Sequence, residues 1–229
     1  PGFNALGDGV RDAIDAEAMA VFPSVETATS LVLDGRPRVG EEVVVFGAGV
    51  VGLCTIAVLS SFPLRRLVAV EPVADRRERA RAFGADVAVP PESLGDAVDT
   101  DGDGVDLVYE LSGRPAVLDT AVAAAGYDGR VIVGSWYGDK PATLDLGSTF
   151  HRDRVSIESS QVSTLAPETR GRWSKDRRAA TAIDRLREID AASLVTHGVP
   201  FADAPEAYRL LDDDTGGVLQ VLLTYSHQQ

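Results

Sequence analysis

The sequence predicts an α/β protein built on a doubly wound parallel sheet. Apolar, strand-like runs alternate with helical segments from residue 42 to residue 135, which is the pattern of parallel strands joined by helical crossovers. A glycine-rich turn separates the first of these runs from the helix that follows it. Apolar residues make up 45% of the 229 residues, enough for a sizeable core without disulfide support.

Local signals place the elements in order. Ser24 is suited to an N-cap and Gly35 to a stop for the first helix, and Gly84 ends an arginine-rich helix. β-branched residues mark the first strand as buried. Six helices are expected, over residues 24–33, 50–60, 74–83, 116–125, 177–188 and 201–211. Seven strands are expected, over residues 42–46, 67–70, 87–89, 105–110, 130–134, 155–157 and 218–225, with a YDG turn before the fifth.

The chain is strongly acidic, with a net charge of −13 and only two lysines, Lys140 and Lys175. Such a surface repels nucleic acid and anionic lipid, so we expect neither as a partner. The composition suits an ordinary soluble acidic protein as well as one from a high-salt cytoplasm. We favour the halophilic interpretation, because salt screens the self-repulsion of an acidic surface.

A single cysteine, Cys54, excludes an intrachain disulfide and a cysteine-rich metal site. It fits a reducing, cytoplasmic setting, and we expect it to be a small buried apolar residue. The first ten residues lack the basic and apolar regions of a secretory signal. Because no apolar run reaches about 18 residues, no membrane span is expected.

Gly47, Gly49 and Gly52 form a G-x-G-x-x-G pattern between an expected strand and an expected helix. In a dinucleotide-binding turn the first glycine permits a tight turn, and the second lets pyrophosphate approach the backbone. The third lets the helix pack close to the strand, and the helix N-terminus offers N–H groups to the phosphates. The alternative is a glycine-rich turn without a ligand.

Glu71 stands 19 residues after Gly52, directly after the second strand. A carboxylate there can accept hydrogen bonds from ribose hydroxyls and repels a 2′-phosphate, which favours NAD over NADP. Arg76 and Arg77 could bind that phosphate, so NADP stays open, and a solvated turn acid is the alternative for Glu71. A methyltransferase is the weaker interpretation, because valine occupies position 51 where its glycine loop has glycine.

Five segments occur in the order typical of one family: GEEVVVFGAGVVGLCTIAVL, VAVEPVADRRERARAFGADVAV, DLVYELSGRPAVLDTAV, GRVIVGSW and VTHGVPFADAPEAYRLL. Over roughly residues 20 to 225 the chain resembles the zinc-type medium-chain dehydrogenase/reductase family, the relatives of alcohol dehydrogenase. The resemblance implies an NAD(P)-binding Rossmann domain over residues 24–165. It also implies a remnant of a GroES-like catalytic domain at the chain ends, residues 1–23 and 166–229.

The function that this resemblance implies is NAD-dependent hydride transfer between a small alcohol or carbonyl substrate and nicotinamide. Most of the family's catalytic domain is absent, so we expect a fragment that binds cofactor with little or no turnover. The alternative is a free-standing NAD-binding module or sensor without catalysis. The strand near VSIESS pairs subunits in the family and would be an open sheet edge here, which predicts a homodimer.

Cofactor contacts carried over from the family fall on several turns. Phosphate and nicotinamide contacts are expected at Gly47, Gly49, Val50, Val51 and Gly52. The adenosine ribose is expected at Glu71, beside Arg76, and the adenine or ribose pocket at Ser112 and Arg114. Gly134 and Ser135 are expected near the nicotinamide. For Ser112 and Ser135, an ordinary turn serine is an equal alternative.

Two residues of the first helix are singled out by the same resemblance. Thr27 aligns with a threonine that contacts nicotinamide. Zinc is expected in an intact family member, but its first two ligands would lie in the absent region, and Phe22 or Pro23 occupies the third ligand position. Glu26 is the nearest substitute ligand, and a helix N-terminal acid is the alternative.

The remaining features are less specific. The segment SSQVSTLAPETRGRW departs from ordinary alcohol dehydrogenases and resembles a branch that includes bacteriochlorophyllide-type enzymes, which indicates a larger alcohol. The basic run at 170–178 is expected to be a solvated helix start or a contact with the absent domain, with phosphate binding as a minor alternative. His151 and His197 are expected at the surface.

Overall fold

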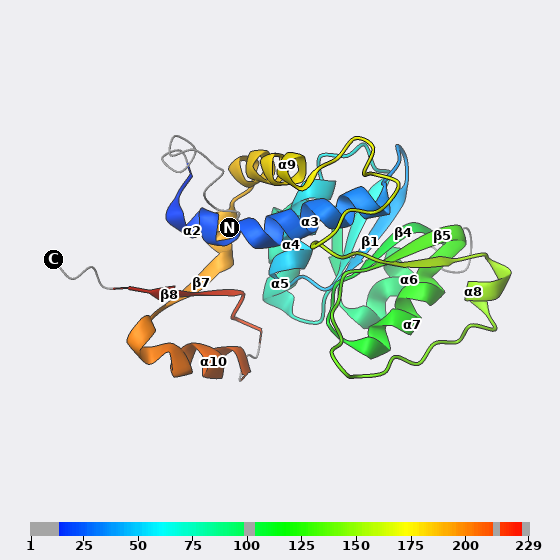
Figure 1. Ribbon diagram of the computed structural model, residues 1–229. Helices are drawn as coiled ribbons and strands as arrows, with labels where there is room; N and C mark the ends of the chain where they lie inside the picture. Colours follow the sequence, from blue (N-terminus) through cyan, green and yellow to red (C-terminus); the bar gives the residue numbers. More distant parts are fainter. Residues whose placement is uncertain (1–13, 99–103, 213–215, 226–229) are drawn as a thin grey trace.

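The computed structural model of the protein describes residues 14–98, 104–212 and 216–225 (Figure 1). Its centre is a six-stranded sheet in which every neighbouring pair is parallel, in the order β3-β2-β1-β4-β5-β6. The doubly wound parallel sheet predicted from the sequence is confirmed. The strands of this sheet are β1 (Glu42–Phe46), β2 (Arg66–Val70), β3 (Val87–Val89), β4 (Val105–Glu110), β5 (Ala125–Val133) and β6 (Ser156–Ser159).

Helices cover both faces of the sheet (Figure 1). One layer contains α3 (Phe22–Gly35), α4 (Val50–Leu59), α5 (Ala74–Ala82) and α9 (Lys175–Glu188). The other contains α6 (Leu94–Ala97), α7 (Pro115–Ala124) and α8 (Thr149–Arg152). The remaining helices are α2 (Ala16–Ala20), α10 (Ala204–Asp212) and the single 3₁₀ turns η2 (Pro91–Ser93), η3 (Ala191–Leu194) and η4 (Phe201–Asp203).

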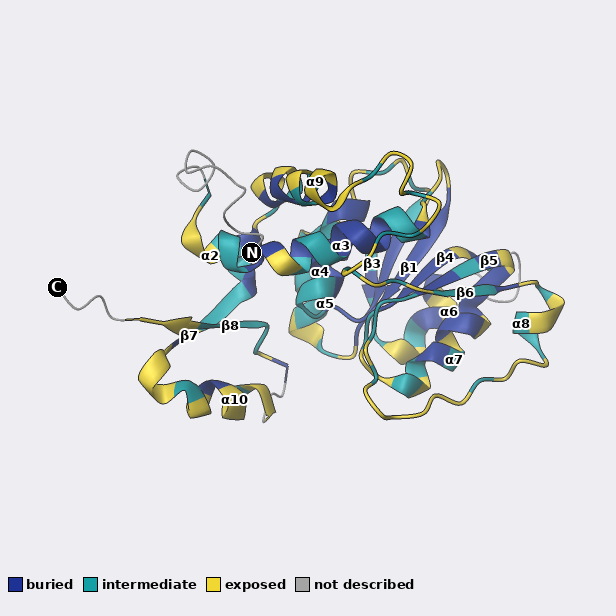
Figure 2. Cartoon of the chain, in the orientation of Figure 1, coloured by how far each residue is buried: buried dark blue, intermediate teal, exposed yellow. Residues whose placement is uncertain are grey.

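The central strands β1, β2 and β4 are mostly buried on both faces because their side chains alternate between two apolar cores (Figure 2). Val43 and Val45 of β1 pack under α3 and α4, whereas Val44 and Phe46 pack toward α6 and α7. All five residues of β1 are buried. Burial on both faces favours a continuous apolar run, here residues 43–46, and this run is the signal that identified the strand in the sequence.

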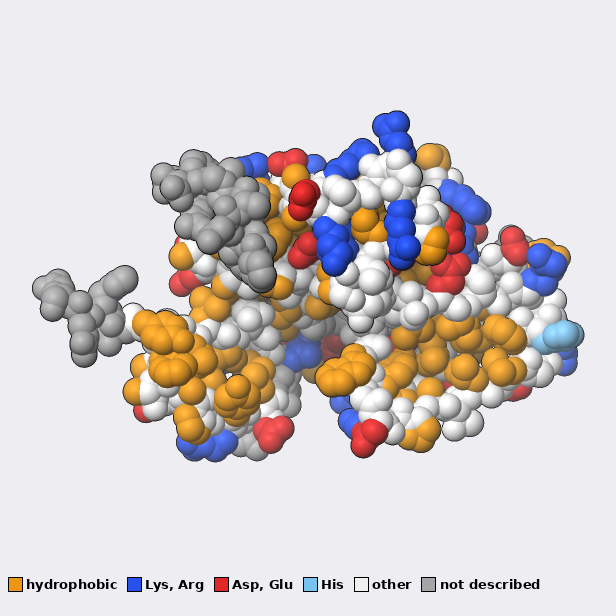
Figure 3. Space-filling model, viewed as in Figure 1, with side chains coloured by type: hydrophobic (Ala, Val, Ile, Leu, Met, Phe, Trp, Pro, Cys, Tyr) orange, Lys and Arg blue, Asp and Glu red, His pale blue; other side chains and the backbone are white. Residues whose placement is uncertain are grey.

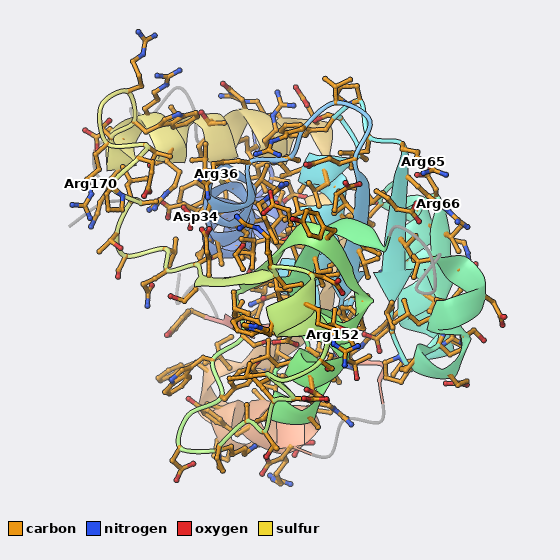
Figure 4. The ribbon with its side chains drawn as sticks, turned by 90° about the vertical axis from the view of Figure 1, so that its right-hand side faces the viewer. Asp34, Arg36, Arg65, Arg66, Arg152 and Arg170 are labelled. Atoms are coloured by element: carbon orange, nitrogen blue, oxygen red, sulfur yellow. The ribbon has the colours of Figure 1, made fainter. Side chains whose placement is uncertain are left out.

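The edge strand β6 is attached to the end of α3 through side chains. The Arg36 guanidinium pairs with both Glu158 oxygens at 3.2 Å, and the Ser160 hydroxyl donates to Asp34 at 2.7 Å. Asp34 and Arg36 lie close together beside this segment (Figure 4). Burial raises the pKa of the Asp34 carboxyl above its ordinary value, against the lowering effect of the Ser160 hydrogen bond.

The fifth strand differs from its prediction. The sequence places a YDG turn before a strand at 130–134, but β5 begins at Ala125 and contains Tyr127, Asp128 and Gly129. Asp128 adopts a left-handed conformation with φ of 58°, and the register with β4 shifts between Val105 and Leu107. The pairing with β4 resumes at Arg130, where the sequence predicts the strand to begin, and the YDG residues form an irregularity between Ala125 and Arg130.

The C-terminal part forms a second, two-stranded parallel sheet of β7 (Val195–Pro200) and β8 (Gln220–Thr224). The β8 strand confirms the strand expected at 218–225, whereas β7 was not expected. A histidine, a glycine and a proline interrupt its apolar pattern. Exposed apolar side chains gather over α10 and β8 (Figure 3), where Phe201 and Tyr225 stack at 4.9 Å.

Helix α9 begins at Lys175, because the Ser174 hydroxyl accepts a hydrogen bond from the Arg177 amide at 3.1 Å. The prediction of a solvated basic helix start is wrong for Arg178, which is 3% exposed. Its guanidinium lies 3.0 Å from the Glu26 carboxylate and 3.3 Å from the Ser30 hydroxyl, both on α3. Amphipathic packing of α9 on α3 is the reason that this arginine is buried.

Helix α2 was not expected, since the opening segment has little pattern. Asp15 caps it by accepting a hydrogen bond from the Glu17 amide at 3.1 Å. Within the described ranges, no helix combines the length and the apolar character that a membrane crossing requires.

Candidate dinucleotide-binding site

A groove of about 650 Å³ lies at the carboxyl edge of the six-stranded sheet. It opens where β1 is flanked by β2 and β4, and the strand order reverses direction at this point. Open α/β sheets bind ligands in the crevice at such a position. The lining residues are Phe46, Gly47, Gly49, Val70, Glu71, Pro72, Val73, Arg76, Pro91, Leu111, Ser112, Arg114, Val117, Thr120, Leu211 and Gly216.

The surroundings of the three glycines in the turn differ in whether they leave space for a side chain. Gly47 has a φ of 96°, and a Cβ there would lie 2.8 Å from the Leu111 carbonyl oxygen. At Gly52 a Cβ would lie 2.0 Å from the Gly47 carbonyl oxygen, inside the packing of strand and helix. A Cβ at Gly49 would meet no atom within 4 Å. Only Gly49 therefore lacks a packing reason within the protein, and it borders the groove.

Helix α4 starts directly after Gly49, which is its N-cap and supplies no side-chain cap. The first amides of a helix have no intrahelical acceptor, and the helix dipole is positive there. Val50 and Val51, the first two helical residues, are half-buried. The turn thus presents backbone donors and a partial positive charge beside the groove.

Glu71 follows β2 and is 4% exposed, so the solvated-turn alternative for this residue is wrong. Its Oε2 accepts a hydrogen bond from the Ala48 amide at 2.8 Å, and its Oε1 accepts one from the Val73 amide at 3.0 Å. A carboxylate has about four acceptor positions, so about two remain for a ligand. The glutamate borders the groove and also holds the glycine turn.

Arg76 lies in the groove wall with its guanidinium bound to the C-terminal segment. It donates to the Gly216 carbonyl at 3.1 Å and to the Val218 carbonyl at 2.9 Å. Gly216 packs so closely that a Cβ there would lie 2.6 Å from Val73. Arg77 donates to the carbonyls of Glu71 and Pro72, each at 2.7 Å.

The turns after β4 and β5 are joined by a hydrogen-bonded cluster. The fully buried Glu110 accepts from the Ser112 amide at 2.8 Å, from the Ser112 hydroxyl and from the Tyr137 hydroxyl. The Gly113 amide donates to the Ser135 hydroxyl at 2.8 Å. The serines at 112 and 135 therefore hold these turns together. Arg114 is exposed and borders the groove at the N-cap of α7.

Gly134 stands at the carboxyl end of β5 in close packing with α3. A Cβ there would lie 2.7 Å from Leu31 and 2.6 Å from Leu111. A side chain at this position would push these two leucine side chains aside, so the close packing favours glycine independently of any ligand.

The two α3 residues lie away from the groove lining and have partners within the protein. The Thr27 hydroxyl donates to the Pro23 carbonyl at 2.9 Å, and Glu26 pairs with Arg178. In the part of the chain that the structure describes, no three His, Cys, Asp or Glu side chains are grouped to hold a metal. The side chains of the described residues therefore do not fit a zinc centre.

The structure brings six of the expected contacts into one groove: Gly47, Gly49, Glu71, Arg76, Ser112 and Arg114. Val50, Val51, Gly52, Gly134 and Ser135 lie next to this lining rather than in it. Sequence reasoning missed Leu211 and Gly216, which reach the groove from the C-terminal segment. It also missed Glu110 and Tyr137, although a carboxylate ending a buried strand was a visible signal.

The sequence profile of the zinc-binding dehydrogenase family matches residues 50–180. D-guloside 3-dehydrogenase of Escherichia coli K12 is 28% identical over 193 residues, which are 82% of this chain and 55% of that protein. The (R,R)-butanediol dehydrogenase of Bacillus subtilis is 31% identical over 159 residues, which are 67% of this chain and 43% of that protein. The chain thus spans about half the length of these relatives.

Solved structures share the fold. The alcohol dehydrogenase RspB of Escherichia coli CFT073, solved with NADH, is similar with a TM-score of 0.77 and 24% identity, over 93% of this chain and 60% of that one. The alcohol dehydrogenase of Thermus sp. ATN1 gives a TM-score of 0.75 and 25% identity, over 93% of this chain and 59% of that one. Because the family profile matches more than half of its residues, the chain belongs to the zinc-binding dehydrogenase family.

Proposed function

We propose that the protein is an NAD-dependent oxidoreductase, or the cofactor-binding part of one, that acts on an alcohol or carbonyl substrate. The observation that supports it most is Gly49, the only glycine of the turn with open space at its Cβ position. A pyrophosphate needs this space to reach the backbone. The relatives that match include dehydrogenases of a guloside and of butanediol.

Each part of the groove has a role in this proposal. The α4 N-terminus and the glycine turn bind the pyrophosphate through backbone N–H groups. Glu71 accepts hydrogen bonds from the adenosine ribose with its remaining lone pairs. The turn after β4, with Ser112 and Arg114, borders the adenine or ribose, and the turn after β5, with Gly134 and Ser135, holds the nicotinamide half. When bound, the nicotinamide ring supplies the hydride chemistry, as donor or acceptor.

NAD rather than NADP is the proposed cofactor. The Glu71 carboxylate borders the groove and would repel a 2′-phosphate. Arg76 and Arg77, the residues that could bind this phosphate, both donate to backbone carbonyls. NADP binding would require them to exchange these bonds for the phosphate.

We propose that residues 24–165 form the cofactor domain and that residues 1–23 and 166–229 belong to a catalytic domain. The separate β7–β8 sheet supports this division, as does the exposed apolar surface over α10 and β8. Thr27 is kept as a proposed nicotinamide contact. Zinc, if the intact protein binds it, would be held by residues outside the groove. Glu26 is the one candidate ligand that we name in the described chain, and it pairs with Arg178.

Assembly and setting are proposals as well. The parallel edge strand β6 has one neighbour, β5, in the described sheet, and an open edge of this kind favours pairing with a second copy. A homodimer is therefore proposed. A high-salt cytoplasm is proposed from the net charge of −13 and the presence of only two lysines. Light scattering in molar KCl would give the mass of two chains, and the mass of one chain would contradict it.

A second function is an NAD-binding module without catalysis. The observation in its favour is that the described side chains form no group suited to a metal, while the groove has the open glycine Gly49 and the N-terminus of α4 at its border. Assay of alcohol oxidation with added zinc tests this second function, because a binding module takes up cofactor without turnover, and turnover by the chain would contradict it.

Fluorescence titration of the chain with NADH and NADPH in molar KCl tests the proposal. We expect NADH to bind more tightly than NADPH and the preference to fall in Glu71→Ala. The exposed Glu168 provides the control, Glu168→Ala. Thermal unfolding of both variants shows whether they fold. Absence of binding by the folded wild-type chain would contradict the proposal.

A further inference from the structure

Glu110 ends β4 as a fully buried carboxylate whose two oxygens serve different turns. Its Oε1 accepts from the Ser112 amide at 2.8 Å and from the Ser112 hydroxyl, within the turn after β4. Its Oε2 accepts from the hydroxyl of Tyr137, in the turn after β5. A buried carboxylate is costly unless it is hydrogen-bonded, so these hydroxyl partners are what keep it stable.

The backbone of the same residue extends the connection. The amides of Gly134 and Ser135 donate to the Glu110 carbonyl at 3.0 and 3.2 Å. Burial, and then the adjacent Glu110 carboxylate, raise the pKa of the Tyr137 phenol above its usual range, so it stays protonated as a donor. Glu110 thereby holds residues 134–137 at both ends: its carbonyl binds the amides of Gly134 and Ser135, and its carboxylate binds the Tyr137 hydroxyl.

The place of residues 134–137 in the sheet indicates what the hydrogen bonds of Glu110 are for. The glycine turn and Glu71 follow β1 and β2, whereas residues 134–137 follow β5, across the point where the strand order reverses. A dinucleotide lies across that point with one nucleotide on each side. With the adenosine half at Glu71, residues 134–137 face the nicotinamide half. Trp136, in this turn, is 90% exposed.

We infer that Glu110 is a positioning residue that holds residues 134–137, through the Tyr137 hydroxyl, where they contact the nicotinamide half of the bound dinucleotide. This inference rests on the proposed function. Glu110 does not touch the ligand itself, because it is fully buried and its oxygens are occupied by Ser112 and Tyr137. A side chain needed only for packing at this strand end would be served better by an apolar residue.

NADH and ADP-ribose separate the two halves of the site, since ADP-ribose lacks the nicotinamide. Both are titrated into the full 229-residue chain and its Tyr137→Phe variant. Loss of the hydroxyl frees the turn, and we expect NADH affinity to fall about tenfold, as for loss of a hydrogen bond to a charged group. ADP-ribose affinity should change by less than about twofold, in keeping with a local effect.

Tyr127→Phe is the matched control, because Tyr127 lies on β5 with 70% exposure, and it should bind both ligands as the wild type does. Glu110→Gln is the second variant. Its amide has one acceptor oxygen, which the Ser112 amide requires, so the group that faces Tyr137 becomes an N–H donor. The charge-assisted bond from the Tyr137 hydroxyl is thereby replaced by a weaker neutral one, in the same isosteric shape. This variant should reproduce the selective loss of NADH affinity, and ADP-ribose binding reports that each variant is folded.

Equal weakening of both ligands would overturn the inference, because Glu110 would then be a general structural residue. Unchanged NADH affinity in Tyr137→Phe and Glu110→Gln would overturn it as well. If the wild type binds NADH no tighter than ADP-ribose, residues 134–137 make no contact with nicotinamide; the inference fails while the dinucleotide site stands. If the wild type binds neither ligand, the proposed function itself fails.

Discussion

The carboxylate of Glu71 accepts a hydrogen bond of 2.8 Å from the amide of Ala48, which fixes the end of β2 to the glycine turn after β1. Both residues are buried. A second bond, from the Val73 amide, completes the attachment of this carboxylate. The residue that the sequence predicts for the ribose therefore also shapes the turn proposed to bind the pyrophosphate.

Replacing Glu71 should destabilise the fold even without a ligand. In Glu71→Ala the buried Ala48 amide loses its acceptor, and the free energy of unfolding should fall by about 1–3 kcal/mol. Urea unfolding of the apo protein measures this change. An unchanged midpoint and slope would show that Glu71 does not hold the turn in solution.

Gly52 should be intolerant of a side chain. A Cβ in Gly52→Ala would lie 2.0 Å from the Gly47 carbonyl oxygen, so α4 must move away from the turn, at a cost of about 1–3 kcal/mol or more. Gly171→Ala is the control, since its Cβ meets nothing within 4 Å. Thermal unfolding should show a clear drop for Gly52→Ala alone, and equal stability of the two variants would contradict the close packing.

The sheet was predictable because its signals are local. The buried β-branched strands and the glycine turn follow from contacts within a few residues, and their order fixes a parallel sheet. The YDG segment was predicted to precede the fifth strand, whereas the structure includes it within β5. An Asp-Gly pair suits the left-handed conformation of Asp128 both in a turn and in an irregular strand, so the sequence does not distinguish the two. Strand β7 was missed because its pairing with β8 is distant in the chain.

The site was predictable only in part for the same reason. Glycines and a carboxylate at strand ends are visible in sequence, whereas Gly216 reaches the groove through the Arg76 hydrogen bond, 140 positions away. The burial of Arg178 depends on how α9 docks on α3, and no pattern within the basic run encodes this docking. The periodicity of the sequence does not reveal such contacts between segments that are distant in the chain.

Arg178 should be essential for attaching α9. Arg178→Leu leaves the Glu26 carboxylate, 23% exposed in its ion pair, without this partner, and we expect a loss of about 3 kcal/mol. Lys175→Leu, at an exposed position of the same helix, is the control. Urea unfolding compares the two variants, and similar midpoints would contradict a structural role for the buried arginine.

Cys54 should be unreactive in the folded protein at pH 8. Burial raises the pKa of its thiol from 9.0 to about 12, so the nucleophilic thiolate is scarce and inaccessible. The contribution of this shift to stability is present below pH 9 and is lost as the pH rises toward 12. Labelling by a thiol reagent should be slow in buffer and fast in urea, and fast labelling in buffer would contradict the buried placement.

Gly49→Val tests the central claim most directly, because a Cβ at Gly49 meets no protein atom within 4 Å. The stability of the variant should stay within about 1 kcal/mol of the wild type, allowing for a poorer N-cap. Calorimetric titration with NADH should show binding by the wild type and by Gly171→Val, and none by Gly49→Val, since the side chain excludes the pyrophosphate. Wild-type affinity in a folded Gly49→Val would contradict the account, because the turn would then not be the dinucleotide site.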